Sequence, residues 1–390
     1  MKNKYVTFVL PCLNEANNID EVVSRIKKTF KENNIKGEII VSDNGSTDGS
    51  RELAKKAGAK VFVTEKRGYG NAYLNMFVDN IDKIKDGYIF MADSDNTYEY
   101  EAIPRFIEKL DEGYEFVIGN RFPLMQKGAM PLMNKYIGNP ILTGMFNLFF
   151  AIKNPIRDVH CGMRGFTKDA IKKMNLKYEG MEFASEMVLK ALRKKLKITQ
   201  VDIKYFPRLG DPSKLNPFRD AWRHVKFMFI HTPTWLFFIP GLILLIFGFF
   251  FQFYFILADY FNLPQSLFGV NIYVIPSIFG AAIALTGFQI ISLGLFANTY
   301  AFSKGLEESD AFFRFLKKFI NINRSIFLGI LLCTVSLILI SYLINKWIAM
   351  GYQFAGNGDQ EVRMATFSIT LFLLGIQIMF SSFFMKVLNK

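Results

Sequence analysis

The sequence predicts an α/β domain with a mostly parallel sheet, followed by a bundle of four membrane-spanning helices. Strand and helix patterns alternate over the first 120 residues, and four long apolar segments follow residue 231. Composition divides the same way: residues 1–226 hold 38 of the 47 Lys and Arg, whereas the remainder holds 27 of the 42 Phe. The first part of the chain is thus suited to water and the second to a lipid membrane. This composition excludes a purely soluble enzyme, a disordered chain and a small disulfide-stabilised domain.

The elements of the first domain follow from hydrophobic periodicity. Strands are expected at 5–10, 38–42, 60–64, 87–92 and 116–119, and helices at 18–30, 51–57, 70–80 and 104–110. In a parallel sheet of this kind the ligand site lies beyond the carboxyl ends of the strands. Polar clusters follow three of the strands, at 11–17, 43–49 and 93–96. We therefore expect the active site where these clusters meet.

Three further segments are candidates for helices at the membrane surface. Residues 131–152 are apolar but too short to cross a bilayer, so an interfacial helix and an ordinary core helix are both open. Residues 215–231 alternate basic and aromatic side chains and predict an amphipathic linker helix, and 310–320 predict another. The expected domains are a catalytic domain at 1–214, this linker at 215–231 and a membrane domain at 232–390.

The membrane domain is predicted to contain four helices, at about 235–257, 272–297, 325–345 and 364–384. A helix of about 21 residues reaches ~32 Å, enough to cross a hydrocarbon core of ~30 Å. The segment 258–271 has no Lys or Arg, whereas 298–324 has five. The positive-inside rule then predicts a multi-pass protein whose catalytic domain, N-terminus and C-terminus are cytoplasmic.

Charge and cysteine content narrow the possible partners. The formal net charge is +13, but no compact basic run matches a nucleic-acid motif. Attraction to an anionic leaflet, at ~1 kcal/mol per basic residue near the surface, explains the charge better. Cys12, Cys161 and Cys333 are too widely spaced for a disulfide framework or a zinc motif. The apolar stretch near the N-terminus is too short for a signal peptide, which agrees with a cytoplasmic first domain.

A DSD turn, at residues 93–95, directly follows a predicted strand. Two carboxylates on one tight turn can bind a divalent cation, which would bridge the phosphates of a nucleotide-sugar. An acidic turn alone is usually exposed surface, but the alignment of this one with two other polar clusters favours a metal site.

The other two clusters predict a nucleotide site. Asp43 at a strand end can accept hydrogen bonds from a nucleobase, and Glu15 can bind a ribose hydroxyl. The alternative is a simple Asx turn, with Asp48 capping the next helix. Gly68, which follows Lys66 and Arg67, offers backbone amides and positive charge to a diphosphate.

Six motifs, taken in order, resemble the family 2 glycosyltransferases of the GT-A fold, and specifically the polyprenol-phosphate (dolichol-phosphate) sugar synthases. They are LPCLNEA (10–16), DNGSTDG (43–49), DSD (93–95), GNRF (119–122), DVHCGMRGF (158–166) and PRLGDPSKL (207–215). The resemblance covers about residues 5–226 and implies a Rossmann-like GT-A domain. It also implies inverting transfer of a hexose from a UDP- or GDP-sugar to a polyprenyl or dolichyl phosphate, with Mg²⁺ or Mn²⁺ as cofactor.

The resemblance, taken with the polar clusters, also implies the site residues. The expected donor site comprises Pro11, Glu15, Asp43, Asn44, Lys66, Gly68, Asp93 and Ser94, with Asp93 and Asp95 as metal ligands. The expected acceptor-phosphate site comprises Arg121, Lys135, Asn139, Arg208, Ser213 and Lys214. The expected catalytic residues are Asp95, Arg121 and Asp158. Because a phosphate monoester is largely dianionic at pH 7, the acceptor needs little help from a base.

The chain departs from the family pattern in three places. Asn44 replaces a second Asp, Asn96-Thr97-Tyr98 replaces a Leu-Gln-His/Asp run, and Pro212 adds a residue between Gly210 and Ser213.

Several roles stay open at this stage. Asp158 is either an orienting or base group or the partner of Arg164, and His160 is either a structural histidine or a ligand. Glu182 and Glu186 either contact the sugar or an arginine, or form a polar helix face.

Two other functions are weaker alternatives. A processive membrane polysaccharide synthase would carry a QxxRW motif, which the sequence lacks. A catalytically silent scaffold or translocator would have no need of Asp93, Asp95 and Arg121. The sequence does not select the sugar, although UDP-glucose is mildly preferred, and it is compatible with a homo-oligomer.

Overall fold

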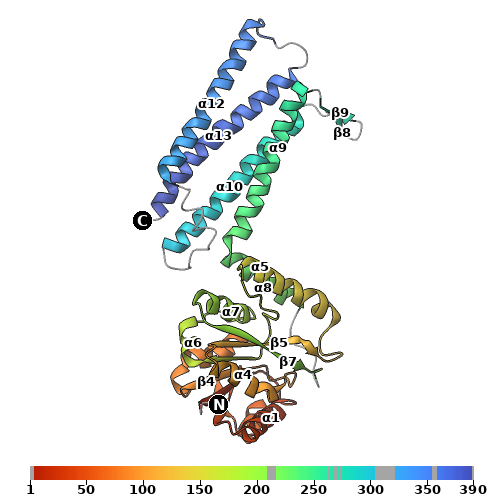
Figure 1. Ribbon diagram of the computed structural model, residues 1–390, viewed down its shortest axis with the longest axis vertical. Helices are drawn as coiled ribbons and strands as arrows, with labels where there is room; N and C mark the ends of the chain where they lie inside the picture. The colour runs from red at the N-terminus through yellow and green to blue at the C-terminus, as the bar shows by residue number, and fades with distance from the viewer. Residues whose placement is uncertain are drawn as a thin grey trace. The chain divides into compact units, whose positions relative to one another are not determined.

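The computed structural model describes residues 4–208, 217–261, 263–264, 266–267, 270–271, 274–303, 321–353 and 358–388. Ser213, Lys214 and the helix predicted at 310–320 lie outside these residues. The chain divides into two compact units, Met1–Met228 and Phe229–Lys390, and each is described by itself (Figure 1).

A seven-stranded sheet forms the centre of the first unit, in the order β3-β2-β1-β4-β6-β5-β7. Its strands are β1 (Tyr5–Cys12), β2 (Gly37–Asp43), β3 (Lys60–Val63), β4 (Gly87–Met91), β5 (Phe116–Met125), β6 (Arg164–Thr167) and β7 (Ile198–Tyr205). Only β6 is antiparallel to its neighbours, β4 and β5. The predicted mostly parallel sheet is therefore confirmed, and β1, β2 and β4 end at the same edge.

Helices and short helical turns surround this sheet. The α-helices are α1 (Ile19–Glu32), α2 (Ser50–Lys56), α3 (Tyr69–Leu74), α4 (Ile103–Asp111), α5 (Asn139–Phe149), α6 (Lys168–Met174), α7 (Phe183–Arg193) and α8 (Pro217–His231). Short π or 3-10 turns are η1 (Asn75–Asp79), η2 (Ile81–Lys83), η3 (Tyr100–Ala102) and η4 (Asn134–Gly138). The helix predicted at 70–80 is thus divided between α3 and the π turn η1.

The core forms where apolar faces of helices meet the sheet. On α1 the buried positions include Ile19, Val22, Val23, Ile26 and Phe30, the stripe that helical periodicity predicts. Full burial of one such side chain contributes about 1.5–3 kcal/mol, and this stripe holds α1 against the sheet.

The segment predicted at 131–152 combines features of both alternatives. Phe146 and Leu142 of α5 are buried in the core, as in an ordinary helix. In contrast, Leu132, Tyr136 and Ile141 are more than half exposed. A row of large exposed apolar side chains therefore lies on a helix that is anchored by its opposite face.

Helix α8 has a similarly divided surface. Phe227 and Met228 are buried in the first unit, whereas Phe218 and Trp222 are 79% and 64% exposed. The sequence prediction of an amphipathic helix at 215–231 matches this distribution of side chains over Pro217–His231.

Four long apolar helices make up most of the second unit. They are α9 (Ile239–Phe261), which the π turn η5 (Thr234–Phe238) precedes, α10 (Ile275–Ser303), α12 (Ile322–Ala349) and α13 (Asp359–Leu388). A small hairpin of β8 (Ser266–Leu267) and β9 (Val270–Asn271) lies between α9 and α10. All four are long and apolar enough to cross a membrane when η5 is counted with α9. They cover the first, third and fourth predicted spans, and the second from residue 275 onward.

Glycines set the packing of α9 against α10. A Cβ atom added at Gly248 would lie 2.4 Å from the backbone nitrogen of Ala284, and one at Gly287 would lie 2.5 Å from that of Leu245. Gly241 and Gly280 are similarly close to the backbone of the facing helix. The two backbones therefore approach as closely as the small-residue interfaces of membrane helices allow.

Candidate active site

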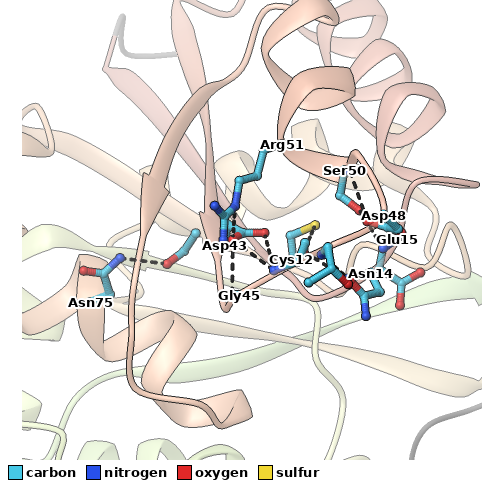
Figure 2. A network of polar contacts seen from close by, with 12 residues as sticks. Cys12, Asn14, Glu15, Asp43, Gly45, Asp48, Ser50, Arg51 and Asn75 are labelled. Atoms are coloured by element: carbon cyan, nitrogen blue, oxygen red, sulfur yellow. Dashed lines mark hydrogen bonds and ion pairs between the residues drawn. The ribbon is translucent and has the colours of Figure 1, made fainter.

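The loops that follow β1 and β2 form one hydrogen-bonded network (Figure 2). The backbone N–H of Asn14 donates to Ser46 Oγ at 2.9 Å, and Thr47 N–H donates to Asn14 Oδ1 at 2.8 Å. Asp48 accepts from the backbone N–H groups of Ser50 and Ala16, so it joins the turn before α2 to the loop before α1. These contacts hold the two loops in one fixed arrangement at the carboxyl edge of the sheet.

Asp43 lies fully buried at the end of β2. Its carboxylate accepts from the backbone N–H groups of Gly45 and Ser46 and forms a 2.5 Å ion pair with Arg51 Nε (Figure 2). A nucleobase at Asp43 would therefore meet a carboxylate that local contacts already orient.

Asn44 has a structural role that explains why an amide is suited to this position. Its Nδ2 donates to the carbonyl of Lys66 at 2.6 Å, and its Oδ1 accepts from Gly68 N–H at 2.7 Å. A carboxylate could accept from Gly68 but could not donate to Lys66. Asn44 thus holds the loop of residues 66–68 beside β2, while the Lys66 side chain remains exposed.

The DSD turn follows β4 and carries its two carboxylates in different environments. Asp93 accepts hydrogen bonds from the hydroxyls of Tyr69 at 3.0 Å and Tyr98 at 3.2 Å. Burial, together with the negative charge of Asp95, raises the pKa of Asp93 to about 6. Ser94 Oγ donates to the carbonyl of Pro11 at 2.6 Å, which joins the turn to the end of β1.

Asp95 and Glu15 are brought together by Arg208. The guanidinium Nη1 lies 3.2 Å from Asp95 Oδ2, and Nη2 lies 2.8 Å from Glu15 Oε1. The other carboxylate oxygen of Asp95 accepts from the Thr97 hydroxyl at 2.6 Å. Arg208, predicted for the acceptor phosphate, therefore contacts Asp95, predicted for the metal, and Glu15, predicted for the donor. Thr97 orients Asp95.

The residues present fit a divalent cation held jointly with a substrate. Within the described ranges, no three His, Cys, Asp or Glu side chains gather as a metal-binding group. Two carboxylates on one turn match Mg²⁺ sites that use one or two carboxylates plus substrate phosphates. Asp95 Oδ2 already faces a positive charge, that of Arg208. Because the turn supplies only two carboxylates, a cation held here would take its remaining ligands from the substrate and from water.

Arg121 and Asp158 form a buried bidentate ion pair. Nε and Nη2 of Arg121 lie 2.7 and 2.9 Å from the two oxygens of Asp158, and the backbone N–H of Arg121 also donates to Asp158. The two residues are 6% and 0% exposed. Burial alone would lower the pKa of Arg121, but Asp158 and other nearby groups hold it well above its usual value.

The alternative pairing of Asp158 with Arg164 is wrong. Arg164 is fully buried and donates instead to the backbone carbonyls of Cys161, Ala184 and Val159, at 2.8, 2.8 and 2.9 Å. Because both oxygens of Asp158 bind Arg121, the geometry favours an orienting role for Asp158 over that of a base.

Lys135 and Asn139 make contacts that do not involve Arg121 or Arg208. Lys135, on η4, contacts the ring of Tyr136, and Asn139, at the start of α5, contacts Met130. In the described residues no hydrogen bond or ion pair joins either of them to Arg121 or Arg208.

Tyr69, Tyr98 and Gly162 belong to this site but were not predicted from the sequence. Gly162 N–H donates to the Tyr98 hydroxyl at 3.0 Å, and a Cβ at this position would lie 2.7 Å from Asp93 Oδ2. A side chain at this position would therefore displace the carboxylate of Asp93 or the hydroxyl of Tyr98. Tyr98 belongs to the segment that departs from the family pattern, which was the available signal.

Glu182 and Glu186 differ in their surroundings. Glu186 accepts from the backbone N–H groups of Lys177 and Tyr178 and forms a 2.7 Å ion pair with Lys190. Its role is thus to join α7 to the preceding loop. Glu182 has one buried carboxylate oxygen without a partner among the described residues.

His160 is partly buried and its ring packs edge to face against that of His224, an arrangement that favours the structural reading over that of a ligand. Burial lowers the pKa of His224 to about 4, and burial together with His224 lowers that of His160 well below its usual value. Arg164 from β6 and, for His160, Arg121 from β5 add positive charge nearby. Both imidazoles are therefore neutral at pH 7.

Acid is expected to destabilise the protein through these histidines. An unfolded histidine has a pKa of about 6.5, so between that pH and about 4 the unfolded chain binds protons that the folded chain does not. The free energy of unfolding therefore falls as the pH is lowered through this window. We expect the loss of Tm between about pH 7.5 and about pH 5 to be smaller in His224→Phe than in wild type. Equal losses in the two proteins would contradict the assignment.

Comparison with known proteins gives two family matches. Residues 7–174 match the model described as glycosyl transferase family 2, and residues 295–389 match the glycosyltransferase family 2 C-terminal transmembrane region. The low-salt glycan biosynthesis hexosyltransferase Agl6 of Haloferax volcanii is 32% identical over 99% of this chain and 89% of its own length.

Two more relatives and a solved structure match over shorter lengths. Glycosyltransferase AglJ of Haloferax volcanii is 36% identical over 55% of this chain and 68% of its own. A dolichyl-phosphate hexose transferase of the same organism is 30% identical over 46% of this chain and 74% of its own. Glucosyl-3-phosphoglycerate synthase from Mycobacterium tuberculosis, solved with Mn²⁺, UDP and glucosyl-3-phosphoglycerate, gives a TM-score of 0.45 at 18% identity, over 58% of this chain and 79% of that one.

Proposed function

Because this chain belongs to the family 2 glycosyltransferases and carries the transmembrane region found in that family, we propose that it is a polyprenol-phosphate sugar synthase. In this proposal a hexose passes from a nucleotide-sugar to the phosphate of a polyprenyl or dolichyl phosphate. The observation that carries the proposal is the convergence of the DSD turn, Glu15 and Arg208 at the carboxyl edge of the sheet. The similarity to a dolichyl-phosphate hexose transferase supports the choice of acceptor.

The donor would lie across the loops after β1, β2 and β4. Asp43 and Glu15 would bind the nucleoside, and the backbone amides near Gly68 would face the diphosphate. Asp93 and Asp95 would hold Mg²⁺ or Mn²⁺, which when bound neutralises the diphosphate leaving group. The hydrogen bonds from Tyr69 and Tyr98 support this assignment because they fix the orientation of Asp93 before the donor arrives.

The acceptor phosphate would bind near Arg121 and Arg208. The phosphate is largely dianionic at pH 7 and attacks without a base, so positioning and charge are what the protein must supply. Asp158 occupies Nε and Nη2 of Arg121, which leaves Nη1 without a hydrogen bond to any described residue. That nitrogen is available to a phosphate oxygen. The roles of Lys135, Asn139, Ser213 and Lys214 at the acceptor remain part of the proposal.

The protein is a membrane protein, and the proposal places its active site at the cytoplasmic surface of the bilayer. The exposed apolar side chains on η4, α5 and α8 support contact with lipid, since several large apolar side chains left exposed on the same helices are typical of an interaction surface. The excess of Lys and Arg in 298–324 over 258–271 supports the orientation.

Purified protein with UDP-glucose and a polyprenyl phosphate is expected to form a lipid-linked sugar. Chelation by EDTA should abolish transfer, and added Mg²⁺ or Mn²⁺ should restore it, because the two carboxylates alone cannot stabilise a leaving diphosphate. The measurement is radiolabel transfer to the organic phase, over a panel of UDP- and GDP-sugars that also identifies the donor. Absence of product from every donor would refute the synthase assignment, and full activity in EDTA would refute the metal.

A further inference from the structure

Three elements of the first unit meet at the buried hydroxyl of Ser185, in the first turn of α7. Its Oγ lies 2.9 Å from Nδ1 of His224 on α8 and 3.4 Å from Nε2 of His160, in the loop between α5 and β6. The two imidazole rings stand edge to face with centroids 4.4 Å apart. We refer to His160, Ser185 and His224 as the serine–histidine joint.

In the joint, each hydrogen bond has one donor and one acceptor that can be assigned, from His160 through Ser185 to His224. Nδ1 of His160 is inaccessible to water and has no partner among the described residues. A proton there would leave a buried N–H donor without an acceptor, which is rarer and more costly than an unused lone pair. The proton of His160 is therefore on Nε2, which donates to Ser185. The hydroxyl of Ser185 has a single proton and donates it to Nδ1 of His224.

The loop 158–162, which carries His160, supports two parts of the candidate active site. Asp158, two residues before His160, orients Arg121. Gly162, two residues after it, donates to Tyr98, whose hydroxyl in turn binds Asp93. A displacement of the loop 158–162 would therefore move the groups proposed for the acceptor phosphate and for the metal.

The helix at the other end leads out of the first unit. Helix α8 spans Pro217–His231, and the first membrane-spanning helix begins at Thr234. The aliphatic contacts of α8, such as that of Val225 with the core, are non-directional and do not by themselves fix the position of the helix. The bond from Ser185 to His224 is directional, and so it fixes the position of α8 relative to α7 and the loop.

We propose that the serine–histidine joint couples α8 to the loop 158–162, and that Ser185 and His224 are positioning residues for sugar transfer. This inference rests on the proposed function. In this proposal the joint keeps Arg121 and Asp93 aligned through the loop 158–162. Neither histidine forms a hydrogen bond with Arg121 or Asp93 among the described residues. The helix that precedes the membrane unit then affects catalysis through two hydrogen bonds.

Substitutions of His224 in the full-length protein in detergent test this coupling. His224→Phe keeps an aromatic ring at this position but removes the acceptor, whereas His224→Asn restores an acceptor near the position of Nδ1. Ser185→Ala is a smaller change that removes both hydrogen bonds. It serves as the second variant if His224→Phe folds poorly. Val225→Ala is the matched control, because Val225 also packs α8 against the core but lies outside the joint.

Two measurements separate positioning from simple loss of structure. Hydrogen exchange of the peptide at 157–166 should accelerate in His224→Phe and Ser185→Ala but not in Val225→Ala. The kcat for transfer to polyprenyl phosphate should fall about tenfold in both variants, which corresponds to about 1.4 kcal/mol of lost transition-state stabilisation. The Kd of the nucleotide-sugar should stay within about twofold, and His224→Asn should recover most of kcat.

Unchanged exchange at 157–166 in both His224→Phe and Ser185→Ala would overturn the coupling. Faster exchange with an unchanged kcat would overturn the positioning role, as would equal losses of kcat in Val225→Ala. If the wild-type protein transferred no sugar, the proposed function would fail, and hydrogen exchange alone would then decide whether α8 and the loop are coupled.

Discussion

Asp95→Asn is expected to reduce sugar transfer by about a thousandfold or more, while the protein remains folded. Removing a group that stabilises charge at the reacting centre costs about 10²–10³ in kcat in other enzymes, and here the binding of the cation itself would also be lost. The asparagine keeps an oxygen for Thr97 but loses the negative charge, and its amide N–H groups would face Arg208. The measurements are kcat at saturating donor, the affinity for Mn²⁺ with UDP, and Tm.

Asp86→Asn is the matched control for this loss of charge. The Asp86 side chain is 98% exposed and pairs with Lys168 at the surface, so its removal should leave both transfer and Tm close to wild type. Wild-type rates in Asp95→Asn would show that Asp95 is not needed for the chemistry. A large fall in Tm would instead assign it a structural role.

Asp158→Ala is expected to destabilise the first unit by about 3–5 kcal/mol, because it leaves the Arg121 guanidinium buried without its partner. Asp158 is fully buried and Arg121 is only 6% exposed, so water would compensate poorly for the lost carboxylate. Differential scanning calorimetry should show a marked fall in Tm, and transfer should be lost with the orientation of Arg121. Helix pair Lys28–Glu32 provides the contrast, since Glu32→Ala removes an exposed ion pair worth less than about 1 kcal/mol.

The double variant Arg121→Met with Asp158→Leu separates stability from function. Replacing both members of a buried ion pair by apolar side chains of similar volume is often neutral or stabilising. Tm should therefore recover relative to Asp158→Ala, whereas transfer should stay undetectable because the guanidinium is absent. Recovery of both properties would show that the pair is only structural, and recovery of neither would point to an undetected change in packing.

Local patterns were sufficient to predict much of the fold. The stripe on α1 and the four apolar helices depend on residues close together in sequence, and each was predicted with errors of a few residues at its ends. Strand β6 was missed because it has only four residues, one of them a glycine, which is too short for a period of two to be recognised.

The partners within the candidate site could not be predicted in the same way. Arg164 is six residues from Asp158 and Arg121 is 37 away, yet the carboxylate pairs with the distant arginine. Sheet topology decides this outcome, because β5 and β6 are neighbours and Arg164 is engaged by backbone carbonyls. Likewise, the role of Asn44 depends on a carbonyl 22 residues later, which no sequence spacing reveals.

The glycines between α9 and α10 have a consequence for how this sequence can vary. Hydropathy scales assign glycine almost no preference for membrane or water, so the positions that decide this interface carry little weight in any search for apolar segments. In a saturation mutagenesis experiment, Gly248 and Gly287 should therefore tolerate few replacements, whereas many of the exposed Phe and Leu residues around them should be interchangeable. The packing of the membrane unit thus constrains its sequence more strongly at these few glycines than at its numerous phenylalanines.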